Sequence, residues 1–572
     1  MNKHNTVKKN IIDFHRDGDF YFDRAQKFLS RGDALNALEN LRRAQRLSPE
    51  EDFYTFRIAR IYSEMGLYSF SDDIYFKLIS QKKCVLESYF GLTQNYMEED
   101  DIETAYHYLK CSYERHKDGA DPVAEAEELG LDADDLYDVI EELEDRSYEL
   151  EERKGLRLVY DRDIYQRKLL MTAHNLMGLQ EFDKAVEAYS VIKPDSKYYC
   201  EALNGITICR YLVKNYKAAA AAADEAERLF PNDVLMLCSR LLLAAKTKDS
   251  VAFEKYLALI LEKKDMQESE RYRAAMVFCE VGRHGLAAQA LETILEECPY
   301  DPQVLLLCAQ AHFNDGDPAR AAEMCRRLMK IDERDSIAKY YLRLFAEPKK
   351  AKVFYTCQVP SREIVRRVKK IAAAIKAAPD KLSETLDTDG ELFSLVLWVE
   401  TLDDISFQLV VYNACLKSGN VRAGEYLREL LLSTAVNSFL KKQLLILILN
   451  GTKGTLNVSL TVDEIFTSSR YNAPRQLEGF PSWFREGYNN VFATLAFMER
   501  NFEAKLNSVA RELLKAAEPH KHALKDKKAL SAALHLLYGG KPAFKSKSVL
   551  CEIYNTNLTT LRAYTKKMGL NV

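Results

Sequence analysis

The stretch from Ala25 to Ala44, AQKFLSRGDALNALENLRRA, holds the pattern that decides the fold of this chain. Small residues stand at Ala25, Ala37 and Ala44, and apolar residues surround them at helical spacing. Similar residues recur 34 positions later, at Ala59, Tyr62, Gly66, Ser71, Tyr75 and Leu78. A fixed period of this length is typical of a solenoid, in which each unit buries its apolar face only against its neighbours.

Each unit of the pattern predicts two antiparallel helices. Small residues such as Ala25 and Ala37 allow the two helices to approach closely. Gly32 and Gly66 are expected to end the first helix, because glycine readily adopts positive φ, and Pro49 is expected to end the second. We therefore predict eight units, which start near Gly18, Asp52, Leu86, Gln166, Cys200, Val234, Glu268 and Pro302.

These units resemble the tetratricopeptide-repeat family. The unit that starts at Glu268 fits very well, whereas the unit that starts at Val234 is degenerate, because Phe253 stands where a small residue is expected. The resemblance implies an all-α superhelical array over somewhat more than half of the chain, with the first helix of each unit lining a concave groove. It also implies a non-enzymatic scaffold or adaptor that binds a protein partner, as a peptide or a helix, in that groove.

Composition sets broad limits on function. A chain of 572 residues is too long for one core, and its net charge of -4 gives no global preference for nucleic acid or anionic membrane. The twelve cysteines form no CxxC pair, which favours reduced core packing over a disulfide framework. The longest apolar run, Leu444 to Leu449, is far short of the ~20 residues that span a bilayer. Without a visible signal peptide, we expect a cytoplasmic protein.

An acidic segment interrupts the period after the third unit. Residues 121–152 contain fifteen Asp or Glu against the single Arg146, while Leu136, Ile140 and Leu143 keep a partly helical spacing. We interpret residues 121–165 as an acidic helical insertion. It is either a solvated helix laid on the solenoid or an acidic arm that mimics or repels nucleic acid or covers a basic surface.

Behind the array, the sequence predicts a mostly helical region with at most a short two-stranded β element. The segments 353–359 and 456–462 alternate between apolar and polar residues and predict two short strands, which could pair with each other. Helical patterns lie at about 361–377, 390–400, 403–417, 420–433 and 436–449. This half loosely resembles helical regions found behind such repeats in bacterial proteins, and the resemblance implies no activity.

These observations predict a domain layout. An N-terminal extension over 1–17 precedes the repeats, and a capping helix closes the second group of units. The expected parts are units one to three at 18–120, the acidic insertion at 121–165, units four to eight at 166–347, a helical domain with short strands at 348–480, and a C-terminal helical region at 481–572.

Phenylalanine occupies the fifth position in each of the first three units. Phe22, Phe56 and Phe90 could form a ladder that receives an amphipathic helix or an extended apolar peptide. Arg57 and Arg60 would lie beside Phe56 and could pair with an acidic group of that ligand. The alternative is that the phenylalanines pack between adjacent helices. The chaperone-tail clamp of the family needs lysine at this position, so capture of a chaperone's C-terminal carboxylate is disfavoured.

The last residues of the chain resemble a helix-turn-helix. Asn555 takes the glycine position of the turn, and Asn557 could cap the second helix. That helix would present the residues Thr559, Thr560, Arg562, Lys566 and Lys567, as a recognition helix does in the major groove. This gives an alternative function, a transcriptional regulator with a repeat sensor and a DNA-binding end. The other interpretation is a helical terminus that does not bind DNA.

The sequence contains no pattern that predicts an enzyme. The motifs HExxH, GxSxG, GxGxxG and GxxxxGK[ST] are absent, and His520 and His522 beside a proline are more typical of a solvated loop than of a metal site. We therefore predict no catalytic residue, no metal site and no cofactor.

Overall fold

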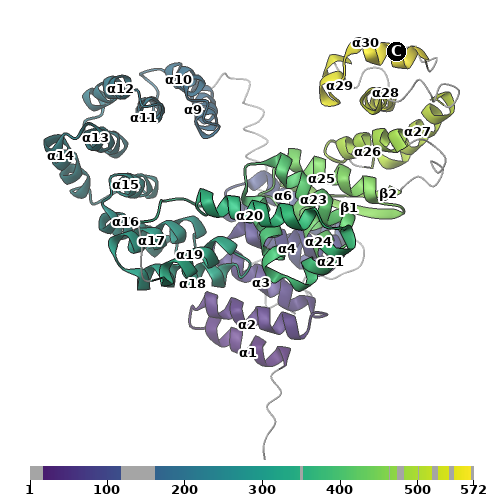
Figure 1. The fold of residues 1–572 in the computed structure, drawn as a ribbon, viewed down its shortest axis with the longest axis horizontal. Helices are drawn as coiled ribbons and strands as arrows, with labels where there is room; N and C mark the ends of the chain where they lie inside the picture. Colours follow the sequence, from purple (N-terminus) through teal and green to yellow (C-terminus); the bar gives the residue numbers. More distant parts are fainter. Residues whose placement is uncertain are drawn as a thin grey trace, which may run out of the picture. The chain divides into compact units, whose positions relative to one another are not determined.

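The computed structural model describes residues 17–116, 162–347, 352–462, 464–472, 482–499, 501–517, 526–539 and 547–567. The chain forms two compact units, one made of Met1–Ile140 with Arg362–Val572 and the other of Glu141–Ser361. Both are built almost entirely of helices (Figure 1). The acidic segment 121–152 and the pair His520 and His522 lie outside the described residues.

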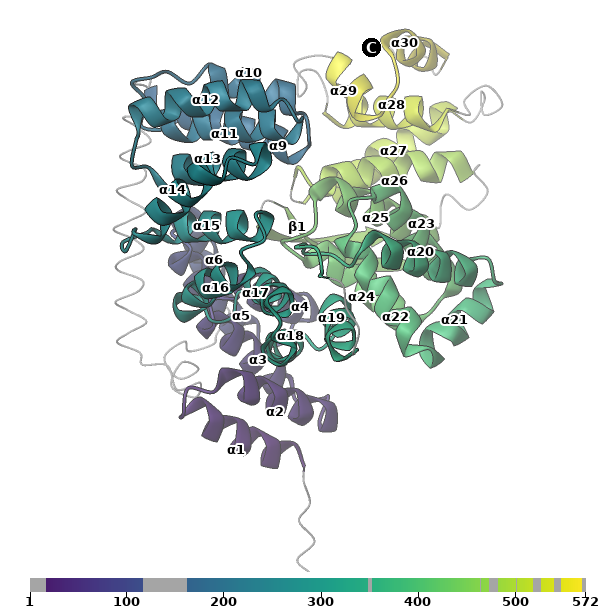
Figure 2. The ribbon, with the colours of Figure 1, turned by 60° about the vertical axis from the view of Figure 1, so that its left-hand side comes forward.

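In the unit Glu141–Ser361, successive helical hairpins stack one on the next (Figure 2). Five hairpins and a capping helix follow the predicted units four to eight, and the degenerate unit from Val234 also forms a hairpin, α13 with α14. The helices are α9 (Arg162–Gly178), α10 (Phe182–Ser190), α11 (Tyr199–Leu212), α12 (Tyr216–Leu229), α13 (Val234–Thr247), α14 (Ser250–Leu261), α15 (Glu268–Glu280), α16 (His284–Glu297), α17 (Pro302–Asp315), α18 (Pro318–Ile331) and α19 (Ser336–Ala346). We call these helices the second array.

The other unit joins the first three hairpins to the C-terminal half of the chain. The first array consists of α1 (Gly18–Leu29), α2 (Ala34–Leu47), α3 (Asp52–Glu64), α4 (Tyr68–Gln81), α5 (Val85–Glu98) and α6 (Ile102–His116). The rest comprises α20 (Ser361–Ile375), α21 (Pro379–Thr388), α22 (Gly390–Trp398), α23 (Ile405–Ser418), α24 (Val421–Leu432), α25 (Ser438–Gly451), β1 (Thr455–Val462), β2 (Ile465–Asn472), α26 (Ser482–Ala496), α27 (Glu503–Ala517), α28 (Lys527–Gly539), α29 (Lys547–Ile553) and α30 (Leu558–Lys567).

Local chemistry at the same positions of the period starts and ends the helices. Asp233, Asp301 and Asp335 stand directly before a helix, and each side chain accepts a hydrogen bond from a backbone N–H of the first turn. An N-cap carboxylate satisfies a donor that the helix leaves unpaired. Gly32 and Gly66 have φ of 73° and 71° and follow the first helix of their hairpins, as predicted.

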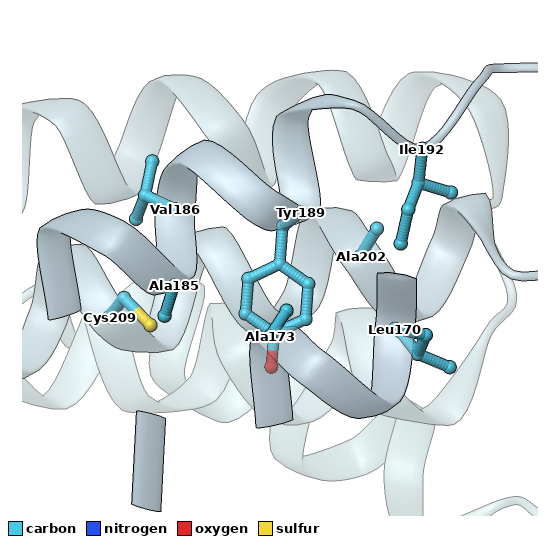
Figure 3. Close-up of a cluster of buried hydrophobic side chains, with 8 residues drawn as sticks. All are labelled: Leu170, Ala173, Ala185, Val186, Tyr189, Ile192, Ala202 and Cys209. Carbon is cyan, nitrogen blue, oxygen red and sulfur yellow. The ribbon is translucent and has the colours of Figure 1, made fainter. Parts of the chain in front are cut away.

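An aromatic ring packs on the bare backbone of the next repeat in both arrays. A Cβ atom on Gly91 of α5 would lie 2.2 Å from Cζ of Tyr75 in α4. Gly205 of α11 stands in the same relation to Tyr189 of α10, at 2.4 Å. The ring of Tyr189 lies in the middle of a buried cluster that includes Ala173 (Figure 3). Glycine is therefore required at these positions, because any side chain would displace the ring.

A buried polar network joins the second and third hairpins. Nδ2 of Asn95 donates to Oγ of Ser71 at 3.0 Å and to Oδ1 of Asp72 at 2.6 Å, and Ser63 donates to Oδ1 of Asn95. Burial raises the pKa of the Asp72 carboxyl to about 8, although the hydrogen bond from Asn95 opposes this shift. The network satisfies polar groups that pack between helices, where an unpaired group would be costly.

The first array packs through its second helices against the C-terminal half. The hydroxyl of Tyr108 in α6 donates to the carbonyl of Glu464 at 2.6 Å and accepts the backbone N–H of Phe466 at 3.0 Å. The ring of Phe76 stacks on Phe466 at 6.3 Å. In α4, Lys77 forms an ion pair of 2.6 Å with Glu429 of α24. Segments more than 300 residues apart in the sequence therefore share one core.

The predicted β element needs two corrections. The strand expected at 456–462 is present as β1, but it pairs antiparallel with β2, from Thr455 opposite Asn472 to Val462 opposite Ile465. The segment 353–359 is extended but forms no strand, so the suggested pairing of these two segments is wrong. The sequence pattern also missed α21.

Replacing Gly91 with alanine should destabilise the first unit. We expect the free energy of unfolding to fall by about 1–3 kcal/mol, because the new Cβ overlaps the ring of Tyr75. Gly424→Ala in α24 is the matched control, since its Cβ would meet no atom within 4 Å and alanine favours a helix by up to about 1 kcal/mol. Denaturant unfolding measures both. Equal effects of the two substitutions would contradict the close-packing account.

Stability should also depend on pH through Asp72. Its carboxyl binds a proton more tightly in the folded than in the unfolded chain, so the free energy of unfolding should fall as the pH rises from about 4 to about 8. The slope for this group is at most about 1.4 kcal/mol per pH unit. Asp72→Asn should flatten it, whereas Asp23→Asn on the exposed face of α1 should not. An unchanged slope in Asp72→Asn would show that the buried carboxyl does not titrate in this range.

Candidate partner-binding grooves

Two of the three phenylalanines predicted to line a groove are half-buried. The ring of Phe22 in α1 lies 5.5 Å from that of Phe53 and 5.8 Å from that of Tyr54 in α3. Phe90 in α5 also keeps part of its surface exposed. Both residues belong to the first helix of their hairpin, as the repeat pattern predicted.

Phe56, the middle member of the predicted ladder, belongs to the core. It is only 3% exposed, and its ring lies 5.9 Å from that of Tyr75 in α4. The same ring of Tyr75 lies against Gly91, so Phe56 is part of the contact between neighbouring repeats. The three rings therefore do not form one exposed ladder, and for Phe56 the alternative of packing between helices applies.

Arg57 and Arg60 lie one turn apart on α3 and leave a cationic group without a partner. Nε of Arg57 is buried and donates no hydrogen bond, and neither arginine forms an ion pair within the described part of the chain. Burial first, and then the nearby charge of Arg60, lowers the pKa of the Arg57 guanidinium, while Glu64 opposes the shift. The pair combines two positive charges with one unsatisfied donor, Nε of Arg57.

In the second array, an extended segment of the chain itself lies along α17. We call residues 352–359 the strap. The side-chain amide of Asn314 donates to the carbonyl of Val353 at 2.9 Å and accepts its N–H at 2.7 Å. One turn earlier, Gln310 donates to the carbonyl of Thr356 at 2.7 Å and accepts its N–H at 2.9 Å. Each amide thus pairs with both backbone groups of one residue.

Further contacts fix the strap on both sides of these amide pairs. The hydroxyl of Tyr355 lies 2.7 Å from Nδ1 of His284, and the two rings are 5.9 Å apart. The hydroxyl of Tyr341 in α19 donates to the carbonyl of Gln358 at 3.0 Å. Val359 is buried at the end of the strap. In contrast, Phe354 points away from the array and is 85% exposed.

The repeat pattern did not identify Gln310 and Asn314, although a signal was present. They are the ninth and thirteenth residues of their unit, positions that line the groove in the repeat family. They stand in a helix whose other residues are mostly apolar, VLLLCAQAHFND. Gln310 is 0% and Asn314 is 7% exposed. A polar side chain among apolar neighbours, one helical turn from another, is a reason to expect a buried hydrogen-bond partner.

At the C-terminus, the predicted hairpin forms, and its local geometry matches the expectation. Asn555 has φ of 50°, and Oδ1 of Asn557 accepts the N–H of Thr560 at 2.8 Å. The core side of α30 holds Leu561, while Tyr554 contacts the buried His535 of α28 at 2.8 Å. Thr559, Arg562, Lys566 and Lys567 are exposed and Thr560 is half-buried. These contacts show a helical end; they give no support to nucleic-acid binding.

The described residues contain no group of three or more His, Cys, Asp or Glu side chains that could hold a metal ion. None of the helices that the structure describes combines the length and apolar character needed to cross a bilayer.

The buried position of Phe56 predicts the effect of its removal. Phe56→Ala should lower the free energy of unfolding by about 3–5 kcal/mol, because it leaves a cavity beside Tyr75. Phe53→Ala on the same helix is the control, since Phe53 is 38% exposed, and should cost about 1 kcal/mol or less. Denaturant unfolding distinguishes the two. A small loss for Phe56→Ala would mean that its ring is free to serve a ligand.

Comparison with known proteins supports the repeat pattern. Residues 272–336 match the family model of the tetratricopeptide repeat. The TPR repeat-containing protein YvcD of Bacillus subtilis (strain 168) is 23% identical over 298 residues, which make up 51% of this chain and 58% of that protein. The match thus spans little more than half of the length of this bacterial relative.

Solved structures of repeat proteins show a distant likeness. One is the APC/C hetero-tetramer Cut9–Hcn1, with 14% identity and a TM-score of 0.25 over 59% of this chain and 57% of that chain. Another is the TPR domain of P58(IPK), with 16% identity and a TM-score of 0.21 over 57% of this chain and 97% of that chain. The matched family model, the 34-residue spacing and the stacked helical hairpins together show that this chain contains repeats of the tetratricopeptide type.

Proposed function

We propose that this chain is a non-enzymatic scaffold that binds an acidic segment of a protein partner in the groove of its first array. Tetratricopeptide-repeat arrays are protein-interaction scaffolds in general, because stacked hairpins create an extended concave surface. The groove and its ligand chemistry are the specific part of the proposal.

The unpartnered cation at Arg57 carries this proposal. A guanidinium that is partly removed from water is costly unless a carboxylate or another acceptor pairs with it. Arg57 and Arg60 project from one face of α3, where two guanidinium groups can bind one carboxylate or two neighbouring ones. The half-buried rings of Phe22 and Phe90 on the flanking first helices would contact apolar parts of the same ligand.

The ligand therefore differs from the one suggested by an aromatic ladder. Since Phe56 is in the core, charge pairing at α3 supplies the specificity, and apolar contacts are confined to the two ends of the groove. An acidic helix or an extended acidic peptide satisfies both requirements.

The proposal is tested by changing the two arginines. Proteins captured by the wild-type chain are identified by affinity purification and mass spectrometry, and the binding of each purified candidate is then measured by calorimetry. The double variant Arg57→Ala, Arg60→Ala should weaken binding of the true partner at least about tenfold, the loss expected for one charge-assisted pair.

The matched control removes two charges from another surface. Arg43→Ala with Arg46→Ala changes α2, the second helix of the first hairpin, and should leave affinity within about twofold. Binding by the Arg57 and Arg60 variant that equals wild type would overturn the proposal. Affinity that also does not fall between low and high salt would show that charge pairing plays no part.

A further inference from the structure

We propose that the groove over α15, α17 and α19 is a second peptide-binding site, that its ligand is an extended peptide, and that the strap is a built-in copy of that ligand. The proposal concerns the second array, whereas the acidic-segment site lies in the first, so either can fail without the other.

The side-chain amides of Gln310 and Asn314 bind the backbone of the strap and not its side chains. Asn314 binds both the N–H and the C=O of Val353, and Gln310 does the same for Thr356. A residue can present both groups to one side only in an extended conformation, as in a β-ladder. The pairs therefore select an extended chain of almost any sequence. They exclude proline at the two paired positions, because proline has no N–H to donate.

The groove is built for an occupant. Gln310 and Asn314 are almost fully buried, and in the structure the strap is the partner of all four of their polar side-chain atoms. The face of α17 that carries them would otherwise present two carboxamides among apolar neighbours. An extended peptide satisfies them in the same way whether it belongs to this chain or to another.

Side-chain contacts define the peptide further. Tyr355 reaches His284 with its hydroxyl, and the buried Val359 lies four residues later. Burial raises the pKa of the Tyr355 hydroxyl above its ordinary range, which keeps it protonated for this contact. Phe354 faces outward and sets no requirement, whereas the thiol of Cys357 contacts Gln303 of α17. The partner segment is therefore an extended peptide with a tyrosine and, four residues later, an apolar residue.

The strap has a large advantage over any competing peptide. It begins only five positions after Glu347, the residue that follows the capping helix α19, so its effective concentration at the groove is on the order of millimolar. If the strap and a free peptide both bind the groove with micromolar affinity, the strap would weaken the apparent affinity of the free peptide about a thousandfold. A partner that binds here must therefore displace the strap, or the strap must first be released.

The proposal is tested with a labelled peptide of the sequence KVFYTSQV, which is the strap with serine in place of Cys357. Fluorescence anisotropy measures its binding to full-length protein. Thr356→Pro removes the N–H that Gln310 accepts and should free the groove, so the peptide should bind this variant at least tenfold more tightly than it binds wild type. Phe354→Ala, on the exposed side of the strap, should bind it no better than wild type.

The second part of the experiment removes the carboxamides of Gln310 and Asn314. Adding Gln310→Leu and Asn314→Leu to Thr356→Pro should abolish binding, and a peptide with proline at the position of Thr356 should not bind. Equal binding to wild type and to Thr356→Pro, or binding that survives the two leucines, would overturn the proposal.

A third measurement does not depend on any variant. The backbone N–H groups of Val353 and Thr356 should exchange with deuterium by local release of the strap, faster than the buried N–H groups within α17. If both exchange only with global unfolding of the second array, the strap is a permanent part of the core and the groove is closed to partners. Should Thr356→Pro fail to fold, Tyr355→Ala replaces it in the binding experiment.

Discussion

The close approach of a tyrosine ring to a glycine fixes how two neighbouring repeats pack at one junction in each array. Tyr75 on Gly91 and Tyr189 on Gly205 bring the second helix of one hairpin against the first helix of the next. A side chain on either glycine would force the two helices apart. Phe56 packs on the same ring of Tyr75, so its side chain is not available to contact a ligand. At this junction, the packing of the array and the chemistry of its ligand surface are therefore linked.

The sequence predicted the repeat arrays well, because a repeated local pattern determines each hairpin. It failed where structure depends on distant partners. The segment of β2 has little alternation of apolar residues, and its edge is held by β1 and by Tyr108, which is more than 300 residues away. Helix α21 has only Leu382 and Leu386 as a buried pair, too short a pattern to distinguish from a loop.

The candidate sites were harder to predict than the fold. Position within the repeat located Arg57 and Arg60 on the first helix, but the burial of Phe56 depends on a ring from the neighbouring helix. For the strap, the sequence predicted the local conformation correctly but the hydrogen-bond partner wrongly. Its alternating residues correctly indicated extended backbone, and the usual inference from such a pattern is a paired strand. Here, side-chain amides of Gln310 and Asn314 supply the hydrogen bonds that a neighbouring strand would supply.

The contact of Tyr108 with Glu464 and Phe466 has a consequence for synthesis of the chain. The two partners are separated by 356 residues, so at roughly 5–20 residues per second the ribosome makes the second about 20–70 s after the first. Throughout this interval, Phe76 and Tyr108 lack the surface that covers them. The second array, whose contacts are local, is translated and can fold within the same interval. Nascent first arrays are therefore the species that chaperones have most time to engage.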